Sequence, residues 1–326
     1  MANAVYSNAR AKALERTLLG RERLYRMAES SSAEDALKIL SEVNFGDGLS
    51  IGDVSEFETL IKVEEKNLFE FVKETCPDKN FIKFLLVKND FHNAEALIKA
   101  KYLKISSEKM LVENGIFDKD FLKEKIMVDE YKDFPKELAD ALLTCDEAFV
   151  SEKATGAFIG NTIKKAYYSY LYDLSKKNKD LKVIFSFKAD CINVSTALRS
   201  RDFNAVKDSF IQGGTLTLSD MRFLAEESFE SIKEKFKFGK LGEYILLAAE
   251  SIEKGAPLSD FERKADSFAL EYLQKYKYSS ENIYPFMLFV YYKLAELQNV
   301  RIVLIGLLNG LPQTEIKGRL RVNYVG

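Results

Sequence analysis

The 326-residue sequence is poor in histidine and cysteine, two residue types that often carry out catalysis or bind metals. His92 is its one histidine, so a two-histidine zinc motif is impossible and a Ser–His–acid triad would depend entirely on this residue. Its neighbours Phe91 and Asn93 favour a packed or surface histidine over a catalytic one. We therefore expect no catalytic residue. The alternative is an enzyme with an unrecognised site, and loss of activity on replacing His92 would support it.

Cysteines and glycines give the same indication. Cys76, Cys145 and Cys191 are widely spaced and form no CxxC pair, which argues against a thiolate metal site and a disulfide framework, and fits a reducing compartment. No GxxxxGK[ST] phosphate loop is present, and the glycines at 46, 48 and 52 miss the GxGxxG spacing by one residue. We expect no cofactor, no bound metal and no small-molecule substrate.

Nucleic acid is an unfavoured partner. The formal net charge is −2, so no overall basic field would gather a polyanion. The stretch at 163–182, IKKAYYSYLYDLSKKNKDLK, interleaves bases with tyrosines, as some single-strand binders do. Its aromatic residues also recur at helical spacing, so an amphipathic helix with a lysine face is the better interpretation.

Charge is distributed unevenly along the chain. Residues 1–28 carry six basic and two acidic residues, a net +4, whereas residues 42–74 carry nine acids and three lysines, a net −6. Such asymmetry either orients a protein against a charged partner or reflects two solvated helix faces, and the sequence leaves both open. The N-terminus lacks the apolar core of a signal peptide, and the longest apolar run, 283–292, is too short to span a bilayer.

Apolar residues recur at helical spacing along most of the chain, for example over 9–28, which predicts an all-α protein. The best strand pattern, VIFSF at 183–187, is flanked by helical pattern. Ser259 and Glu262 have the spacing of a capping box, and Thr217 with Asp220 offers similar helix-start chemistry. Breaks between helices are predicted at the glycines at 46, 48, 52, 115, 213, 214 and 310.

Three stretches of the sequence resemble one another. Each has an aromatic-rich segment, then an acid, an asparagine three residues later and an apolar segment, and the asparagines are 100 and 106 residues apart. This predicts a threefold helical repeat with approximate domains at 1–114, 115–214 and 215–326. The acid and asparagine pairs that mark it are Asp90 with Asn93, Asp190 with Asn193, and Glu296 with Asn299.

These polar pairs are expected to be structural. An acid and an amide at the entry of an apolar helix can accept hydrogen bonds from free N–H groups, so we expect each pair to hold a helix start. Arg301 either pairs with Glu296 or faces a partner. The third repeat departs from the others because Leu294 replaces the lysine found at Lys88 and Lys188, and because it lacks their later glycine break.

Several segments resemble one known family. The segments at 6–19 (YSNARAKALERTLL), 29–46 (ESSSAEDALKILSEVNFG) and 188–201 (KADCINVSTALRSR) are similar to the family of C and d subunits of rotary V-type and archaeal-type ATPases, and 281–326 is the most similar of all. The resemblance runs from end to end and includes the three repeats.

This resemblance implies a fold and a function. It implies three similar helical domains with pseudo-threefold symmetry, which form a funnel with a central cavity. It also implies a non-catalytic rotor adaptor, present in one copy per complex, peripheral on the cytoplasmic face of the membrane. Its implied partners are the proteolipid ring and the central stalk, and its implied work is to pass torque between ATP chemistry and ion transport. The sequence leaves open whether the ion is H⁺ or Na⁺ and whether ATP is made or hydrolysed.

Basic residues near the repeats are the candidate contacts to stalk or ring, although each is equally well explained as an ordinary ion-paired arginine. They are Arg10, Arg199, Arg201, Arg301 and Arg319. The alternative function is a helical-repeat scaffold that binds proteins in solution, because solenoids share this composition and repeat logic. Solenoid repeats are usually shorter than these, which favours the closed three-domain body.

Overall fold

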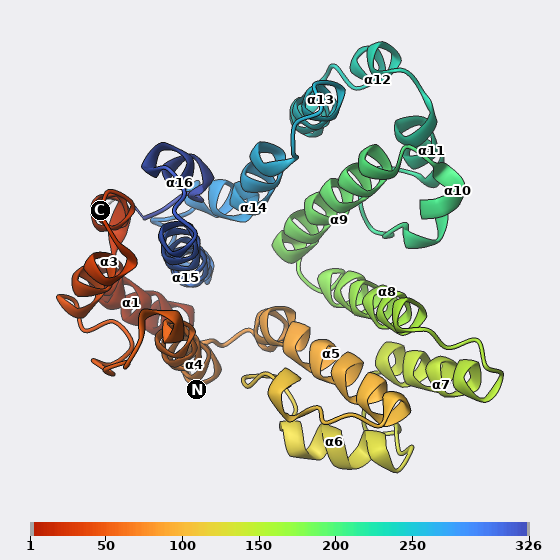
Figure 1. Cartoon of the computed structure of the whole chain (residues 1–326), viewed down its shortest axis with the longest axis horizontal. Coiled ribbons are helices and arrows are strands. Elements are labelled where there is room, and N and C mark those ends of the chain that lie inside the picture. The colour runs from red at the N-terminus through yellow and green to blue at the C-terminus, as the bar shows by residue number, and fades with distance from the viewer. Residues whose placement is uncertain (1–2, 325–326) are drawn as a thin grey trace. The chain divides into compact units, whose positions relative to one another are not determined.

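The computed structural model describes residues 3–324 and, within that range, shows helices and connecting loops with no strand (Figure 1). The all-α prediction is confirmed. By internal packing the chain divides into two compact units: unit 1 comprises residues 1–78 with 257–326, and unit 2 comprises 79–256. The division into three domains near residues 114 and 214 remains a prediction.

Unit 1 is built around one long apolar helix, α15, whose neighbours come from both ends of the chain. Pro285 stands near its start, where a missing N–H costs no hydrogen bond. A helix that is apolar on every side must be buried on every side, and six other helices of the unit pack against α15. The helices of unit 1 are α1 (Ala4–Leu14), α2 (Gly20–Ala28), α3 (Ala33–Ser41), α4 (Glu58–Thr75), α14 (Ser259–Gln274), α15 (Tyr284–Leu308) and α16 (Gln313–Arg319).

Unit 2 has three long helices, α5, α8 and α9. In space α5 packs against α8, and α8 packs against α9 (Figure 1). The short helices α6 and α7 cover α5 and α8, whereas α10, α11 and α13 pack against α9. The helices of this unit are α5 (Lys79–Leu103), α6 (Lys119–Met127), α7 (Lys136–Val150), α8 (Gly156–Ser175), α9 (Lys179–Ser200), α10 (Phe203–Val206), α11 (Leu218–Glu226), α12 (Phe229–Lys235) and α13 (Gly239–Glu253). The strand-like VIFSF lies inside α9.

Most of the predicted helix punctuation agrees with the structure. All seven glycines expected to separate helices lie in connections. Thr217 and Asp220 form a complete capping box at the start of α11. The capping box at Ser259 is wrong, because α14 already begins at Ser259 and no side chain caps its first turn.

The helical spacing over residues 9–28 conceals a break. After α1 comes a short 3₁₀ turn, Glu15–Thr17, then Leu18 in an extended conformation, and Gly20 with φ +69° at the start of α2. The break turns the backbone N–H of Leu19 away from helical bonding and toward α15, where Glu296 accepts it.

The stretch at 295–310 lies largely inside α15 and belongs to the core of unit 1. Leu297, Val300, Val303 and Leu304 pack there with apolar residues of α2, α3 and α4. Within residues 3–324, no helix has both the length and the apolar character needed to cross a bilayer. The apolar character of α15 therefore reflects burial among helices.

Candidate functional site

Asp190 and Asn193 of α9 hold the loop that leads into α11. The Asp190 carboxylate accepts hydrogen bonds from the backbone N–H groups of Thr215 and Leu216, each at 2.9 Å, and from the Thr215 hydroxyl at 2.7 Å. Asn193 uses both ends of its amide on Ile211, donating to the carbonyl at 2.8 Å and accepting from the N–H at 2.9 Å. We call this arrangement a loop clamp.

Asp90 and Asn93 of α5 form the same clamp one repeat earlier. Asp90 accepts from the N–H groups of Ile116 at 2.9 Å and Phe117 at 3.0 Å. Asn93 exchanges two hydrogen bonds of 2.8 Å with the backbone of Val112. Both polar side chains are almost fully buried, so hydrogen bonds to the loop backbone replace the ones that each would make with water.

A glycine makes room for the carboxylate in both clamps. A Cβ on Gly115 would lie 2.2 Å from the Asp90 carboxylate, and one on Gly214 would lie 2.0 Å from that of Asp190. No side chain fits at such distances, because ordinary van der Waals contact begins beyond 3 Å. The two predicted glycine breaks are therefore also packing requirements of the clamps.

The third clamp, on α15, is completed by both ends of the chain. Asn299 exchanges the same two hydrogen bonds with the backbone of Arg321, at 2.7 and 3.3 Å. Glu296 accepts from Leu19, which precedes Gly20 in the N-terminal segment. In this repeat the acid and the asparagine therefore hold two different segments, one before α2 and one after α16.

The expected role of these pairs was therefore wrong in one respect. They lie in the middle of long helices and hold distant loops, whereas we expected them to hold helix starts. Their own helices satisfy their backbone groups, so the side chains are free to bond elsewhere. The signal in the sequence was the glycine that follows each of the first two acids at nearly the same distance.

A buried ion cluster lies beside the third clamp. Lys293 contacts Glu296 of its own helix at 2.7 Å and Glu64 of α4 at 2.8 Å. Glu64 also accepts from the N–H of Gly46, at 2.7 Å. Lys293 therefore links α15 to α4. The two carboxylates that it contacts, Glu296 of α15 and Glu64 of α4, each also accept a hydrogen bond from a backbone N–H.

The charges of this cluster shape one another. Burial raises the pKa of Glu296, and the ion pair with Lys293 offsets this only in part. Burial lowers the pKa of Lys293, but attraction to Glu296 and Glu64 outweighs it, so the net pKa is raised and the ammonium stays charged. The repeat departs from the others at Leu294, and the lysine one position earlier, Lys293, supplies the positive charge between the two acids.

Arg301 forms ion pairs inside unit 1. Its guanidinium lies 2.8 and 3.0 Å from the Glu58 carboxylate and 3.2 Å from that of Glu65, both on α4. Of the two alternatives left open by the sequence, pairing with Glu296 is wrong, and the guanidinium is turned toward α4. Arg10 is exposed, with hydrogen bonding to the Tyr6 hydroxyl at 2.8 Å.

The other three candidate arginines are placed differently. Arg201 has left-handed backbone, φ 52°, and donates to the carbonyls of Leu224 and Glu227 at the end of α11. Arg319 is half exposed and pairs with Glu315 one turn earlier. Arg199 is exposed near the end of α9. Arg10, Arg199 and Arg319 thus present the most accessible charge of the five.

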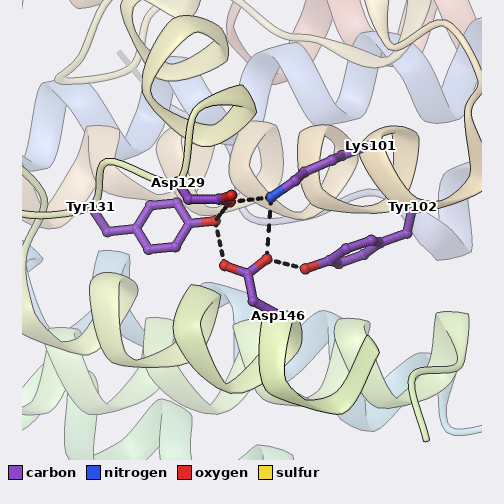
Figure 2. Close-up of polar contacts among 5 residues, drawn as sticks. All are labelled: Lys101, Tyr102, Asp129, Tyr131 and Asp146. Carbon is purple, nitrogen blue, oxygen red and sulfur yellow. Dashed lines mark hydrogen bonds and ion pairs between the residues drawn. The ribbon is translucent and has the colours of Figure 1, made fainter. Parts of the chain in front are cut away.

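A polar cluster in unit 2 joins α5, α7 and the connection between α6 and α7 (Figure 2). Asp146 of α7 accepts from the hydroxyls of Tyr102 and Tyr131 and lies 3.3 Å from the Lys101 ammonium. Asp129 accepts from Tyr131 at 2.9 Å and pairs with Lys101. Burial and the two carboxylates raise the pKa of Tyr131, so its hydroxyl stays protonated and donates. No sequence periodicity indicates this cluster, because three separate segments supply it.

The same cluster responds to acid in a defined direction. The hydrogen bond from Lys101 lowers the pKa of Asp129 below its ordinary value. A carboxyl with a lowered folded-state pKa stabilises the fold at neutral pH, and that contribution is lost as pH falls through the folded pKa. The stability that Asp129 contributes through this cluster is therefore present at neutral pH and lost in acid.

The basic N-terminal segment borders a surface pocket of 680 Å³ in unit 1. It lies at the start of α2 and is walled by two tyrosine rings. The residues that line it are Leu18, Leu19, Gly20, Arg21, Glu22, Arg23, Tyr25, Arg26 and Tyr324. The sequence indicated the charge of this segment but not the pocket.

Other chemistry is sparse in the part of the chain that the structure describes. Residues 3–324 contain no group of three or more His, Cys, Asp or Glu side chains placed to hold a metal ion. The three cysteines are buried as free thiols, and burial raises the pKa of Cys145 to about 11. His92 is exposed, 3.0 Å from the carbonyl of Met110.

Comparison with known proteins decides the family. Residues 7–319 match the family described as ATP synthase (C/AC39) subunit. The chain belongs to this family. It is therefore a structural, non-catalytic component of a rotary ATPase.

Individual relatives agree along nearly their whole lengths. The chain is 26% identical to the C subunit of the A-type ATP synthase of Desulfurococcus sp. (strain SY), over 96% of this chain and 89% of that protein. It is 20% identical to the C subunit of the V-type sodium ATPase of Enterococcus hirae, over 95% of each. It is 23% identical to the C subunit of the A-type ATP synthase of Methanocaldococcus jannaschii, over 98% of this chain and 86% of that protein.

Replacing Asn193 with alanine tests the clamps of this ATPase subunit. The change leaves the buried N–H and C=O of Ile211 without partners, so we expect a loss of roughly 2–4 kcal/mol in the free energy of unfolding. Urea denaturation followed by circular dichroism measures it. The matched control is Asn161→Ala on the exposed face of α8, expected to change stability by less than about 0.5 kcal/mol. Equal effects would show that Asn193 does not hold the loop.

Replacing Lys293 with methionine tests the buried ion cluster. Two buried carboxylates lose their cation, so we expect a loss of roughly 3–5 kcal/mol at neutral pH, against less than about 0.5 kcal/mol for the exposed Lys62→Met. Burial already raises the pKa of Glu296, and without the cation that opposes this effect its folded-state pKa rises further. Stability then falls as pH rises and returns on acidification. A loss independent of pH would contradict this account.

Replacing Asp146 with alanine tests the polar cluster of unit 2. The Tyr102 and Tyr131 hydroxyls lose an acceptor inside the protein, and we expect a loss of about 2 kcal/mol in the free energy of unfolding. The control is Asp140→Ala, an exposed position on the same helix, with an expected change below about 0.5 kcal/mol. Thermal unfolding of both variants at pH 7 makes the comparison.

Proposed function

We propose that this ATPase subunit is the rotor adaptor that sits on the membrane proteolipid ring and receives the central stalk. In this role it transmits torque that couples ATP hydrolysis or synthesis to the transport of H⁺ or Na⁺. The observation that carries the proposal is the family match over residues 7–319. One copy per complex, peripheral at the cytoplasmic face of the membrane, completes the proposal.

The internal contacts of the chain support a torque-bearing role. An adaptor must resist twisting, and flexible connections would absorb the applied torque. In this chain a buried asparagine and a buried acid fix the loop after α5 and the loop after α9, and the equivalent pair on α15 fixes Arg321 after α16 and Leu19 before α2. Buried hydrogen bonds of this kind hold a loop in one conformation, because breaking them strands polar groups away from water.

The exposed arginines are the proposed contacts. Arg10, Arg199 and Arg319 are exposed enough to meet a stalk or ring protein. Arg201 and Arg301 are already bonded to the backbone and acids of their own unit, so their proposed contribution is to position neighbouring helices.

Reconstitution tests the function. The purified chain is mixed with the central-stalk subunits and the detergent-solubilised proteolipid ring of the same source, and the products are analysed by native mass spectrometry. The expected species contains one copy of this chain together with both stalk and ring. If the chain stays free at micromolar concentration while both partners remain intact, the rotor-adaptor proposal is wrong and a soluble scaffold takes its place.

A pair of variants refines the same experiment. Arg10→Gln removes an exposed charge proposed to contact a partner, and we expect about a tenfold weaker assembly. Arg16→Gln removes an equal charge from the neighbouring turn and is expected to assemble as the unchanged chain does. Equal assembly by both variants would remove Arg10 from the interface.

A further inference from the structure

The pocket at the start of α2 combines an excess of positive charge, three arginines to the one acid Glu22, with a preformed shape. Within residues 3–324, neither Arg21 nor Arg23 forms an ion pair with a carboxylate. Arg21 instead lies over the Tyr25 ring at 4.9 Å and donates to its hydroxyl at 3.0 Å. Arg26 lies 3.6 Å from Glu42 at a position where both side chains are about half exposed, so this pair neutralises little.

The walls of this pocket are fixed by contacts outside it. The Tyr324 hydroxyl donates to Glu15 at 2.9 Å, and its ring packs edge-on against Tyr292 at 5.4 Å. Leu18 and Leu19 are buried, and the Leu19 N–H is held by Glu296. A ligand would therefore meet groups that are already ordered, which reduces the entropy lost on binding.

The residue types indicate carboxylate as the ligand chemistry. A guanidinium presents a planar fork that matches a carboxylate with two parallel hydrogen bonds. Glu22 in the first turn of α2 offsets part of this charge, but the three arginines that line the pocket outnumber it. Arginine and tyrosine are also the residues that most often dominate binding energy at protein interfaces.

A membrane surface fits the pocket less well. None of the residues that line it is an exposed large apolar side chain that could enter a bilayer. A concave site walled by two tyrosines suits a protein segment.

We propose that this pocket receives an acidic segment of another subunit of the rotary ATPase, held through Arg21 and Arg23. The proposal rests on the proposed function for the identity of the partner, and on the pocket itself for the acidic chemistry. It assigns the basic N-terminal segment to a protein contact.

Fluorescence anisotropy with a labelled decaglutamate peptide tests the chemistry on the full chain. We expect Arg23→Gln to weaken binding about tenfold and Arg16→Gln, an equal charge change outside the pocket, less than about twofold. Arg21→Gln is a second variant, and thermal unfolding confirms that each protein is folded. Equal weakening by Arg16→Gln and Arg23→Gln would mean diffuse attraction and overturn the proposal.

Two further measurements separate the remaining outcomes. Binding to phosphatidylglycerol vesicles that depends on Arg23, without binding to the peptide, would assign the pocket to lipid and overturn the proposal. In the reconstitution with stalk and ring, unimpaired assembly of Arg23→Gln would overturn the pocket assignment while the rotor-adaptor function stands. Failure of the unchanged chain to assemble would instead remove the proposed function, and the peptide experiment would still decide whether the pocket is specific for an acidic segment.

Discussion

Hydrogen bonds from buried side chains to loop backbone hold the long helices and the loops of this protein together. The acid and the asparagine of each clamp are buried, and backbone groups of distant segments satisfy them: one loop in each of the first two clamps, and two separate segments in the third. These hydrogen bonds hold the loop in one conformation, and they offset the cost of removing the acid and the amide from water. Loss of either partner would leave the other buried and unpaired, so neither the side chain nor the loop can change alone.

The third clamp shows how the two ends of the chain become part of one unit. Asn299 holds Arg321, close to the C-terminus, and Glu296 holds Leu19 in the N-terminal segment. Lys293 adds a contact to Glu64, so α4 is tied into the same place. In the other two clamps the bonded backbone lies 18 to 27 positions from the side chain, whereas Glu296 and Leu19 are 277 positions apart. The ends of the chain are for this reason structural elements of unit 1.

Positive charge in this ATPase subunit serves two different purposes. Arg301 is paired with the acids of α4, and Arg201 with carbonyls at the end of α11, so their charge is used within the fold. Arg21 and Arg23 line a pocket, and among residues 3–324 neither forms an ion pair with a carboxylate. The difference matters because a paired guanidinium has little affinity left to offer, whereas an ordered and unpaired one retains it.

The helical class, the family, the glycine breaks and the positions of the acid and asparagine pairs can all be predicted from the amino-acid sequence. Those features are local or repeated, so spacing and residue type are enough to reveal them. The roles of the pairs required the folded structure: Asp190 reaches Thr215 across a loop, and Glu296 reaches Leu19 from the other end of the chain. The fold likewise turns Arg301 toward α4 and gathers two tyrosines and a lysine around Asp146. Helical periodicity reports which face is buried, but the partner of a buried polar group depends on which distant backbone folding brings within hydrogen-bond reach.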